Sequence, residues 1–349
     1  MDEGTATRRA TVHDVAREAG VSLATVDRVL NDRPGVRPQT AQRVEDAIRT
    51  LDFRRDLSAS LLARARDIRI RFLIPDGSNE FMASLAAAIE GRARPALAQR
   101  LLVMTERLRA LDATGLAARL IALDPSDCDC AIVVATESDE VLAAVDTVIR
   151  RGIVVMTLVS DLPGSRRRAF VGIDNLAAGR TAASLLGRFC PKGKIGVIAG
   201  SLGLRDHRQR LEGFRAVMET EFPQLVIVGP LEGHDQRDET EALTIKLLDE
   251  NPDLMGLYNL GAGNAGLLAA LDRTNRTAAI RVIAHELTPS TIAGLKSGAI
   301  DVVLDQNPER EIRSAIALAR SLVFDPEGRA EAGLIRPIEI GIFLRDNLR

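Results

Sequence analysis

The spacing of apolar residues changes near residue 68 of the chain. Between residues 11 and 53, apolar side chains recur every three or four positions in three short segments. From residue 68 onward, short runs of Val, Ile, Leu and Ala alternate with amphipathic stretches. The first pattern predicts three short helices, and the second predicts a series of strand–helix units.

Local signals mark the ends of the three predicted helices. Thr11 with Asp14 three positions later is typical of a capping box, and Gly20 is suited to a left-handed helix end. Ser22 is placed to cap the second helix, and Pro38 suits the first position of the third.

Nine runs in the second part of the chain have the composition of buried strands. They are 70–74, 131–135, 154–159, 169–173, 194–199, 225–229, 256–260, 281–284 and 302–304. Continuous apolar runs between helices indicate parallel sheets covered on both faces. So many units exceed one comfortable sheet, so we predict an α/β fold of two lobes. A ligand is expected between the lobes, at the carboxyl ends of the strands.

These patterns divide the chain into four segments. We expect a disordered N-terminus over 1–10, a helix-turn-helix domain over 11–53, a short linker over 54–67 and a two-lobed ligand-binding and dimerisation domain over 68–349.

Composition narrows the class of protein. The net charge of -2 gives no bulk signal for nucleic acid, and 3% aromatic residues argue against base-stacking platforms for single strands. The first residues lack the apolar core of a signal peptide, and no apolar run reaches the length of a membrane span, which favours a cytoplasmic location. Cys128 and Cys130 resemble half of a metal site, but no second Cys or His pair accompanies them, so we expect a structural role and no metal or cofactor.

The segment over 11–31 contains a helix, a tight turn and a second helix, which is the arrangement of a helix-turn-helix. Spacing alone also allows a small helical docking domain. The string TVHDVAREAGVSLATVDRVLNDRPGVRPQT resembles the headpiece of the LacI/GalR (lac-repressor) family of bacterial transcription regulators over about 45 residues.

This resemblance implies roles for individual residues. Leu23, Ala24 and Arg28 fall where the family meets base edges, and an arginine can donate two hydrogen bonds to guanine. Asp27 departs from the family's usual serine; it either orients Arg28 or accepts a hydrogen bond from cytosine. The expected phosphate contacts are Ser22, Thr25, Asn31 and Thr40.

The linker resembles the family's hinge helix. Leu62 falls where family members insert a leucine into the minor groove, with Ser58 and Ala59 on the same helix. The alternative is a linker residue packed on the body of the protein. Paired hinge helices imply a homodimer on a pseudo-palindromic DNA operator.

The remainder is similar to the family's effector domain, which shares its fold with ribose-type periplasmic sugar-binding proteins. The strings VGIDNLAAGRTAASLLGRF at 171–189 and RQRLEGF at 208–214 carry this resemblance. It implies a carbohydrate or polyol effector contacted by residues at strand ends, namely Asn79, Phe81, Asp161, Arg210, Asn259, His285, Glu286 and Gln306.

Each of these residues also has a structural reading. Asn79 could serve only as a helix cap, Phe81 as a core residue, and Arg210 and Asp161 as a salt bridge. The family's Asn-Asp pair is absent after the strand that ends at Asn259, so Asn264 is an alternative contact.

Two further motifs favour other interpretations. Gly261, Gly263 and Gly266 form a GxGxxG sequence, and Glu286 follows twenty residues later, as in a dinucleotide-binding oxidoreductase. The basic run 166–168 follows a Pro-Gly pair and is expected to be a solvated turn rather than a second DNA patch. The favoured function is a DNA-binding transcription regulator, a repressor whose operator affinity is controlled by a small ligand, and not an enzyme.

Overall fold

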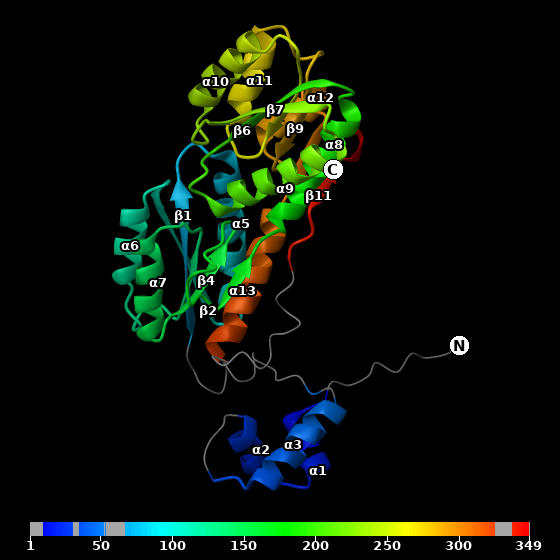
Figure 1. The fold of residues 1–349 in the computed structure, drawn as a ribbon. Helices are drawn as coiled ribbons and strands as arrows, with labels where there is room; N and C mark the ends of the chain where they lie inside the picture. The colour runs from blue at the N-terminus through cyan, green and yellow to red at the C-terminus, as the bar shows by residue number, and fades with distance from the viewer. Residues whose placement is uncertain (1–9, 31–34, 52, 54–66, 325–336, 349) are drawn as a thin grey trace, which may run out of the picture. The chain divides into compact units, whose positions relative to one another are not determined.

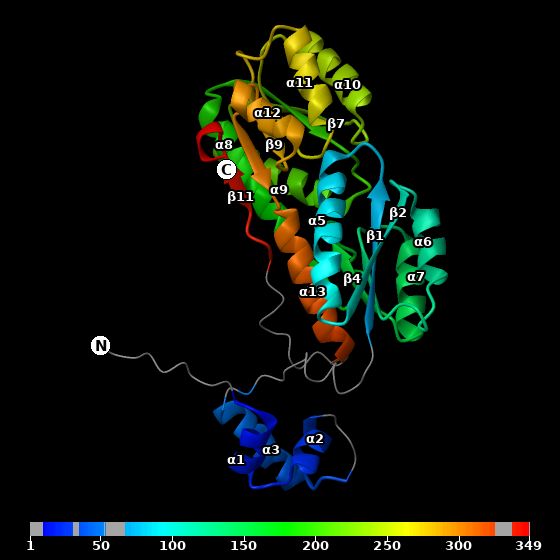
Figure 2. The ribbon, with the colours of Figure 1, turned by 180° about the vertical axis from the view of Figure 1, so that it is seen from behind.

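The computed structural model describes residues 10–30, 35–51, 53, 67–324 and 337–348. The chain divides into two compact units, residues 1–65 and 66–349. Figures 1 and 2 show the elements of each unit from two sides. No helix in the described part of the chain is long and apolar enough to cross a membrane.

The first unit contains α1 (Val12–Ala19), α2 (Leu23–Leu30) and α3 (Pro38–Thr50). The predicted signals at the helix ends are confirmed. Thr11 and Asp14 form a capping box, Gly20 has a φ of 62°, and the Ser22 hydroxyl accepts a hydrogen bond from a backbone amide of α2. The buried residues of the three helices and their flanks form one core: Val15, Ala16, Ala19, Val26, Val44, Ala47 and Phe53.

The first lobe of the second unit is a five-stranded parallel sheet in the order β2-β1-β3-β4-β5. Its strands are β1 (Ile68–Asp76), β2 (Leu101–Arg109), β3 (Cys130–Val133), β4 (Val154–Leu158) and β5 (Ala169–Val171). Its helices are α5 (Glu80–Leu97), α6 (Ala113–Ile121), α7 (Asp139–Arg150) and α13 (Pro308–Phe324). Helix α13 comes from the far end of the chain and lies beside α5 in both views (Figures 1 and 2).

The second lobe is a six-stranded sheet in the order β11-β10-β9-β8-β6-β7. Its strands are β6 (Gly193–Ala199), β7 (Leu225–Glu232), β8 (Leu254–Asn259), β9 (Arg281–His285), β10 (Val302–Asp305) and β11 (Gly341–Phe343). Its helices are α8 (Asn175–Phe189), α9 (Arg205–Glu221), α10 (Arg237–Glu250), α11 (Asn264–Arg273) and α12 (Pro289–Ser297). A short 3-10 helix, η1 (Arg345–Asn347), follows β11.

All nine predicted strands are present, but two strands were missed. Strand β2 lies at a sheet edge; it begins with the apolar run 101–104 but continues with Thr105, Glu106 and Arg107, and most of its positions are half-buried or exposed. Strand β11 has three residues and pairs antiparallel to β10, which makes it the exception to the predicted parallel pairing.

The chain passes from the first lobe to the second after β5, returns between β10 and α13, and passes to the second lobe again before β11. An isolated parallel bridge between Ile173 and Ile338 joins the first and the third of these passages. The first two passages therefore begin at the carboxyl ends of strands, β5 and β10.

Helices α8 and α9 cross at two glycines. A Cβ on Gly179 of α8 would lie 2.0 Å from the carbonyl oxygen of Arg210, and a Cβ on Gly213 of α9 would lie 2.1 Å from that of Leu176. No side chain fits at either distance, so the two backbones touch directly. The sequence strings at 171–189 and 208–214 encode this crossing, and it sets the position of Arg210 on α9.

We expect Gly179→Ala to destabilise the protein by at least about 1–3 kcal/mol, because an added methyl group forces two packed backbones apart. Urea unfolding of the full chain measures this change. Gly91→Ala is the matched control: Gly91 is exposed within α5 and a Cβ there meets nothing within 4 Å. That variant should gain about 0.5–1 kcal/mol from helix propensity. Equal effects of the two substitutions would contradict the crossing.

Candidate functional site

One face of α2 is exposed in the first unit. Leu23, Ala24, Asp27 and Arg28 are all exposed, while Val26 between them is fully buried. These four positions follow helical spacing, so the helix offers a continuous surface with the arginine at its later end. An apolar residue as exposed as Leu23, at 42%, is available for contact with another molecule.

The predicted phosphate-contacting residues lie at the starts of helices or outside the described residues. The hydroxyl groups of Ser22 and Thr25 form a hydrogen bond of 2.9 Å at the start of α2. Thr40 is half-buried in the first turn of α3. Asn31, and the hinge residues Ser58, Ala59 and Leu62, lie outside the residues that the structure describes.

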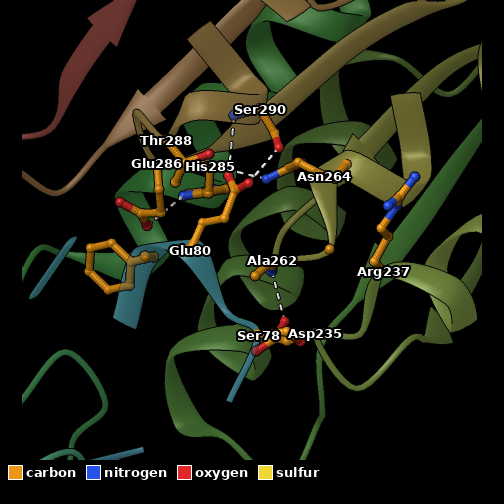
Figure 3. A pocket seen from close by; sticks show the side chains of 13 residues that line it. Ser78, Glu80, Asp235, Arg237, Ala262, Asn264, His285, Glu286, Thr288 and Ser290 are labelled. Carbon is orange, nitrogen blue, oxygen red and sulfur yellow. Dashed lines mark hydrogen bonds and ion pairs between the residues drawn. The ribbon is translucent and has the colours of Figure 1, made fainter. Parts of the chain in front are cut away.

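Two neighbouring cavities lie in the second unit where the strands end. The inner cavity, of about 70 Å³, is lined by residues that follow β1, β3, β4, β7, β8, β9 and β10. The outer cavity, of about 380 Å³, is lined by the N-terminal ends of α5, α11 and α12 and by the loop before α10 (Figure 3).

Arg210 is the central polar group of the inner cavity. It is 2% exposed. Its Nε donates to Oδ1 of Asn175 at 2.8 Å, and its Nη1 donates to the carbonyl oxygen of Leu260 at 2.9 Å. Its Nη2 lies 3.6 Å from Oε1 of Glu286 and makes no hydrogen bond within the described residues. The Nη2 nitrogen of the guanidinium is thus left to donate to a ligand.

Three more buried polar side chains that line the inner cavity have an atom without a hydrogen-bond partner among the described residues. These atoms are Ser160 Oγ, Asp206 Oδ1 and Gln306 Oε1. Because a buried polar group without a partner costs free energy, such atoms mark positions where a polar ligand is favoured. Two of the three accept hydrogen bonds only, which suits a ligand rich in hydroxyl donors.

Glu286 contacts both cavities and is held by Gln306. Gln306 donates from its side-chain Nε2 to Oε1 of Glu286 at 2.6 Å and from its backbone amide to Oε2 at 3.2 Å. Burial raises the pKa of Glu286 to about 8, although Arg210 acts in the opposite direction. Glu286 also has a φ of 68°, a conformation that is rare for a side chain of this kind and that turns it toward the cavities.

His285 lies behind Glu286 and is fully buried. Its Nε2 shares a hydrogen bond of 2.9 Å with the hydroxyl of Tyr258. Burial, assisted by Arg210, holds the pKa of His285 well below its usual range. The imidazole is therefore neutral and supports the cavity wall.

Hydrogen bonds and ion pairs connect the two lobes around the cavities. Glu80 of the first lobe accepts from the hydroxyl of Ser290 at 2.6 Å and from its backbone amide at 3.2 Å (Figure 3). Asn79 donates to Asp235 at 3.1 Å. Glu137 after β3 forms ion pairs with Arg205 and Arg208 of α9.

Several predicted ligand contacts do lie at the cavities. Asn79, Phe81, Arg210, Glu286 and Gln306 line the inner cavity, and Phe81, His285 and Glu286 line the outer one. The alternative role of Asn79 is also real, because its Oδ1 caps α5.

Asp161 and Asn259 line neither cavity, so the geometry does not support these two predictions. Asp161 pairs with Arg167 and accepts from Thr157, which also shows that Arg167 is part of a structural ion pair. Asn259 is fully buried and donates to Asn264 at 2.8 Å. The alternative contact Asn264 does line the outer cavity.

Sequence reasoning missed Ser160, Asp206, His207 and Asp235, which all line a cavity. Asp206 and His207 stand one helical turn before Arg210 on α9, so helical periodicity was a usable signal for them. Ser160 follows Val159, whose φ of 64° turns the chain just before it. No pattern in the sequence indicates that turn.

The three glycines of the GxGxxG sequence are each required by contacts within the protein. A Cβ on Gly261 would lie 2.5 Å from the amide of Gly200, and one on Gly266 would lie 1.9 Å from the carbonyl oxygen of Arg237. Gly263 has a φ of 80° at the start of α11. The amide of Ala262 donates to the carboxylate of Asp235 at 2.7 Å, where a dinucleotide would need to bring its pyrophosphate. The oxidoreductase alternative finds no support.

The cysteines have a simple environment. Cys128 and Cys130 are buried, and burial raises the pKa of the Cys128 thiol to about 12, which disfavours the thiolate that a metal needs. Within the described ranges, no group of three or more His, Cys, Asp or Glu side chains is arranged to hold a metal ion.

These features define a protein with a three-helix headpiece and a two-lobed binding domain with a polar cleft. The chain belongs to the periplasmic binding protein domain family, whose model matches residues 70–326. Residues 11–56 match the model of the lacI family of bacterial regulatory proteins, so the headpiece is a lacI-family helix-turn-helix domain.

Curated relatives match over parts of the chain. Catabolite control protein A of Priestia megaterium is 46% identical over 80 residues, which is 23% of this chain and 24% of that protein. The chain thus spans about a quarter of the length of the first such relatives. The HTH-type transcriptional regulator DegA of Bacillus subtilis is 29% identical over 213 residues, covering 60% of this chain and 61% of that protein.

Solved structures resemble the two-lobed unit. The glucose-galactose binding protein GanP of Geobacillus stearothermophilus has a TM-score of 0.71 at 21% identity, covering 81% of this chain and 99% of that one. A transporter solute-binding protein of Burkholderia graminis in complex with D-arabinose has a TM-score of 0.72 at 20% identity, covering 81% and 97%. At these identities, the likeness shows the fold.

The raised pKa of Glu286 predicts a pH dependence of stability. A carboxyl that binds its proton more tightly in the folded protein contributes stability below its ordinary pKa of 4.5, and this contribution is lost as pH rises toward about 8. We expect the free energy of unfolding to fall by on the order of 2–4 kcal/mol over this range, since one pKa unit corresponds to about 1.4 kcal/mol.

Urea unfolding at pH 5 and pH 8 measures this loss. Glu286→Gln, which imitates the protonated carboxyl, should flatten the profile. Glu90→Gln, at an exposed position of α5, is the matched control and should keep the slope. An unchanged slope in Glu286→Gln would contradict the assignment.

Proposed function

We propose that this protein is a sequence-specific DNA-binding transcription regulator, a repressor whose operator affinity is controlled by a small carbohydrate or polyol. The observation that carries the proposal is the pairing, in one chain, of an exposed lacI-type α2 face with a cleft whose buried polar atoms lack partners. A carbohydrate offers the many hydroxyls that such a cleft favours.

The exposed α2 face supports direct reading of bases. Arg28 contacts a guanine in the major groove, and Leu23 and Ala24 offer apolar contacts to a thymine methyl. Asp27 stands one position before Arg28 and orients it. Nη1 of Arg28 lies near Gly35, 3.5 Å from the position that a Cβ on that residue would take.

Further DNA contacts complete the proposed interface. Ser22, Thr25, Asn31 and Thr40 contact phosphates and set the register. Ser58, Ala59 and Leu62 form the minor-groove hinge within a linker over 54–67, between a DNA-binding domain over 11–53 and an effector and dimerisation domain over 68–349. The protein acts in the cytoplasm as a homodimer on a pseudo-palindromic operator.

The effector contacts Asn79, Phe81, Arg210, Glu286 and Gln306. Because these residues come from both lobes, a ligand that binds them all favours one arrangement of the lobes over others. Operator affinity then changes by the difference in ligand affinity between the arrangements, typically about 1–3 kcal/mol.

A selection from a random duplex library with the full chain tests the DNA-binding part. We expect enrichment of a pseudo-palindromic sequence. No enrichment, with and without a metabolite extract, would overturn the proposed function.

Arg28→Ala should lower affinity for the selected operator by about 1–3 kcal/mol and relax the preference at one base position in each half-site. Quantitative footprinting on operators with single base changes measures both effects. Arg43→Ala, at an exposed position of α3, is the control and should leave the order of base preferences intact. If Arg28→Ala keeps the wild-type order, its role as a base contact is wrong.

Ser160→Ala should weaken effector binding about two- to tenfold, the value of one hydrogen bond of about 0.5–1.5 kcal/mol. Its hydroxyl has no partner in the described structure, so the substitution should not lower the stability of the free protein. Titration of the effector-bound and free forms, followed by the fluorescence of Tyr258, measures the affinity, since the chain has one Tyr and no Trp. Unchanged affinity for an effector would remove Ser160 from the site.

A further inference from the structure

The two cavities share five lining residues and therefore adjoin. These are Ser78, Phe81, Asp235, Ala262 and Glu286. The inner cavity, of about 70 Å³, is far below the range of about 300–1,000 Å³ that is usual for small-molecule sites, while the outer one, of about 380 Å³, lies within it. A ligand that uses the unpartnered atoms of the inner wall must therefore extend into the outer cavity.

The helix starts around the outer cavity are already occupied by carboxylates of the chain. Glu80 accepts from the amide of Ser290 in the first turn of α12, and Asp235 accepts from the amide of Ala262 just before α11. Figure 3 shows both contacts at the cavity wall. A phosphate placed there would lie beside two negative charges, with Arg237 as the one cationic side chain among the lining residues.

The inner wall also disfavours an anion. The guanidinium of Arg210 has already committed two of its nitrogens to Asn175 and Leu260. Its remaining nitrogen faces Glu286, and Asp206 lines the same cavity. Asp76 and Asp235 line it as well, so carboxylates outnumber the one arginine of this cavity even with Glu286 protonated, and their oxygens accept hydrogen bonds from hydroxyl groups.

The outer cavity has the mixed surface that a sugar ring requires. Ser78, Asn264 and Ser290 supply uncharged polar groups, and Phe81 and Ala265 supply apolar surface for the C–H bonds of a ring.

We propose that the effector is an unphosphorylated carbohydrate of two units, a disaccharide or a glycoside. One unit lies at the junction of the two cavities and directs hydroxyl groups inward toward Arg210, Ser160 and Gln306, and the other occupies the outer cavity between α5, α11 and α12. This inference rests on the proposed carbohydrate effector and specifies its size and charge.

Isothermal titration of the full-length protein with matched probes tests the inference. The probes are D-glucose, D-galactose and D-xylose, the 6-phosphates of the two hexoses, and disaccharides built from each sugar. We expect at least one disaccharide to bind at least tenfold more tightly than either of its units, and the phosphates to bind more weakly than the free hexoses. A phosphate that binds more tightly than its free sugar would overturn the inference, as would equal affinities for a disaccharide and its units.

A substitution in the outer cavity tests the contribution of the second sugar unit to affinity. Ala265 is half-buried and lines the outer cavity but not the inner one, so Ala265→Leu narrows the outer cavity. We expect this variant to lose the preference for the disaccharide while its affinity for the monosaccharide stays within twofold of wild type. Ala269→Leu, one turn further along α11 at a half-buried position outside both cavities, is the matched control and should retain the preference.

The outcomes distinguish the two proposals. If no neutral carbohydrate binds, the carbohydrate part of the proposed function is wrong and this inference fails with it. If monosaccharides bind and Ala265→Leu leaves the disaccharide preference unchanged, the proposed function stands and the two-unit effector is wrong.

Discussion

The second unit depends on a buried guanidinium, that of Arg210. A buried charge is tolerated only with partners, and here they come from three separate parts of the lobe: Asn175 on α8, the carbonyl of Leu260 after β8, and Glu286 after β9. Contact between the backbones of α8 and α9 at Gly179 and Gly213 places the guanidinium where all three can reach it. The crossing of two helices thus determines the geometry of the cleft wall.

The electrostatics of the cleft follow from this arrangement. Burial raises the pKa of Glu286, and it also raises the pKa of Asp305 and of Glu311. Glu311 lies fully buried in the first turn of α13, and its carboxyl oxygens lack hydrogen-bond partners among the described residues. These carboxyls surround one arginine, so protonation limits the accumulation of negative charge. The wall therefore offers hydrogen-bond acceptors without strong positive charge, which favours neutral polyhydroxylated ligands over anions.

The sequence was informative where a local signal decides the structure. Helix caps such as Thr11 and Gly20, and all nine buried strands, were predicted from residue type and spacing. Strand β2 was missed although it begins with the apolar run 101–104, because polar residues follow within the same strand. Ser160 was missed because valine is not a residue type typical of the positive φ that Val159 has. Asp161 was predicted as a ligand contact from its place at the end of a strand. In the structure, Asp161 pairs with Arg167, and the residue one position before it, Ser160, lines the cavity.

The contacts between the lobes bear on how an effector acts. Glu80 with Ser290, Asn79 with Asp235, and Glu137 with Arg208 connect the lobes through side chains of the chain itself. This arrangement therefore has stabilising interactions of its own, and a ligand does not have to supply the whole free energy of closure. A ligand changes the population of arrangements only through contacts that differ between them, such as simultaneous contacts to Phe81 of one lobe and Gln306 after β10. Because Gln306 stands two residues before the start of α13, a contact to it acts at the segment where the chain returns to the first lobe.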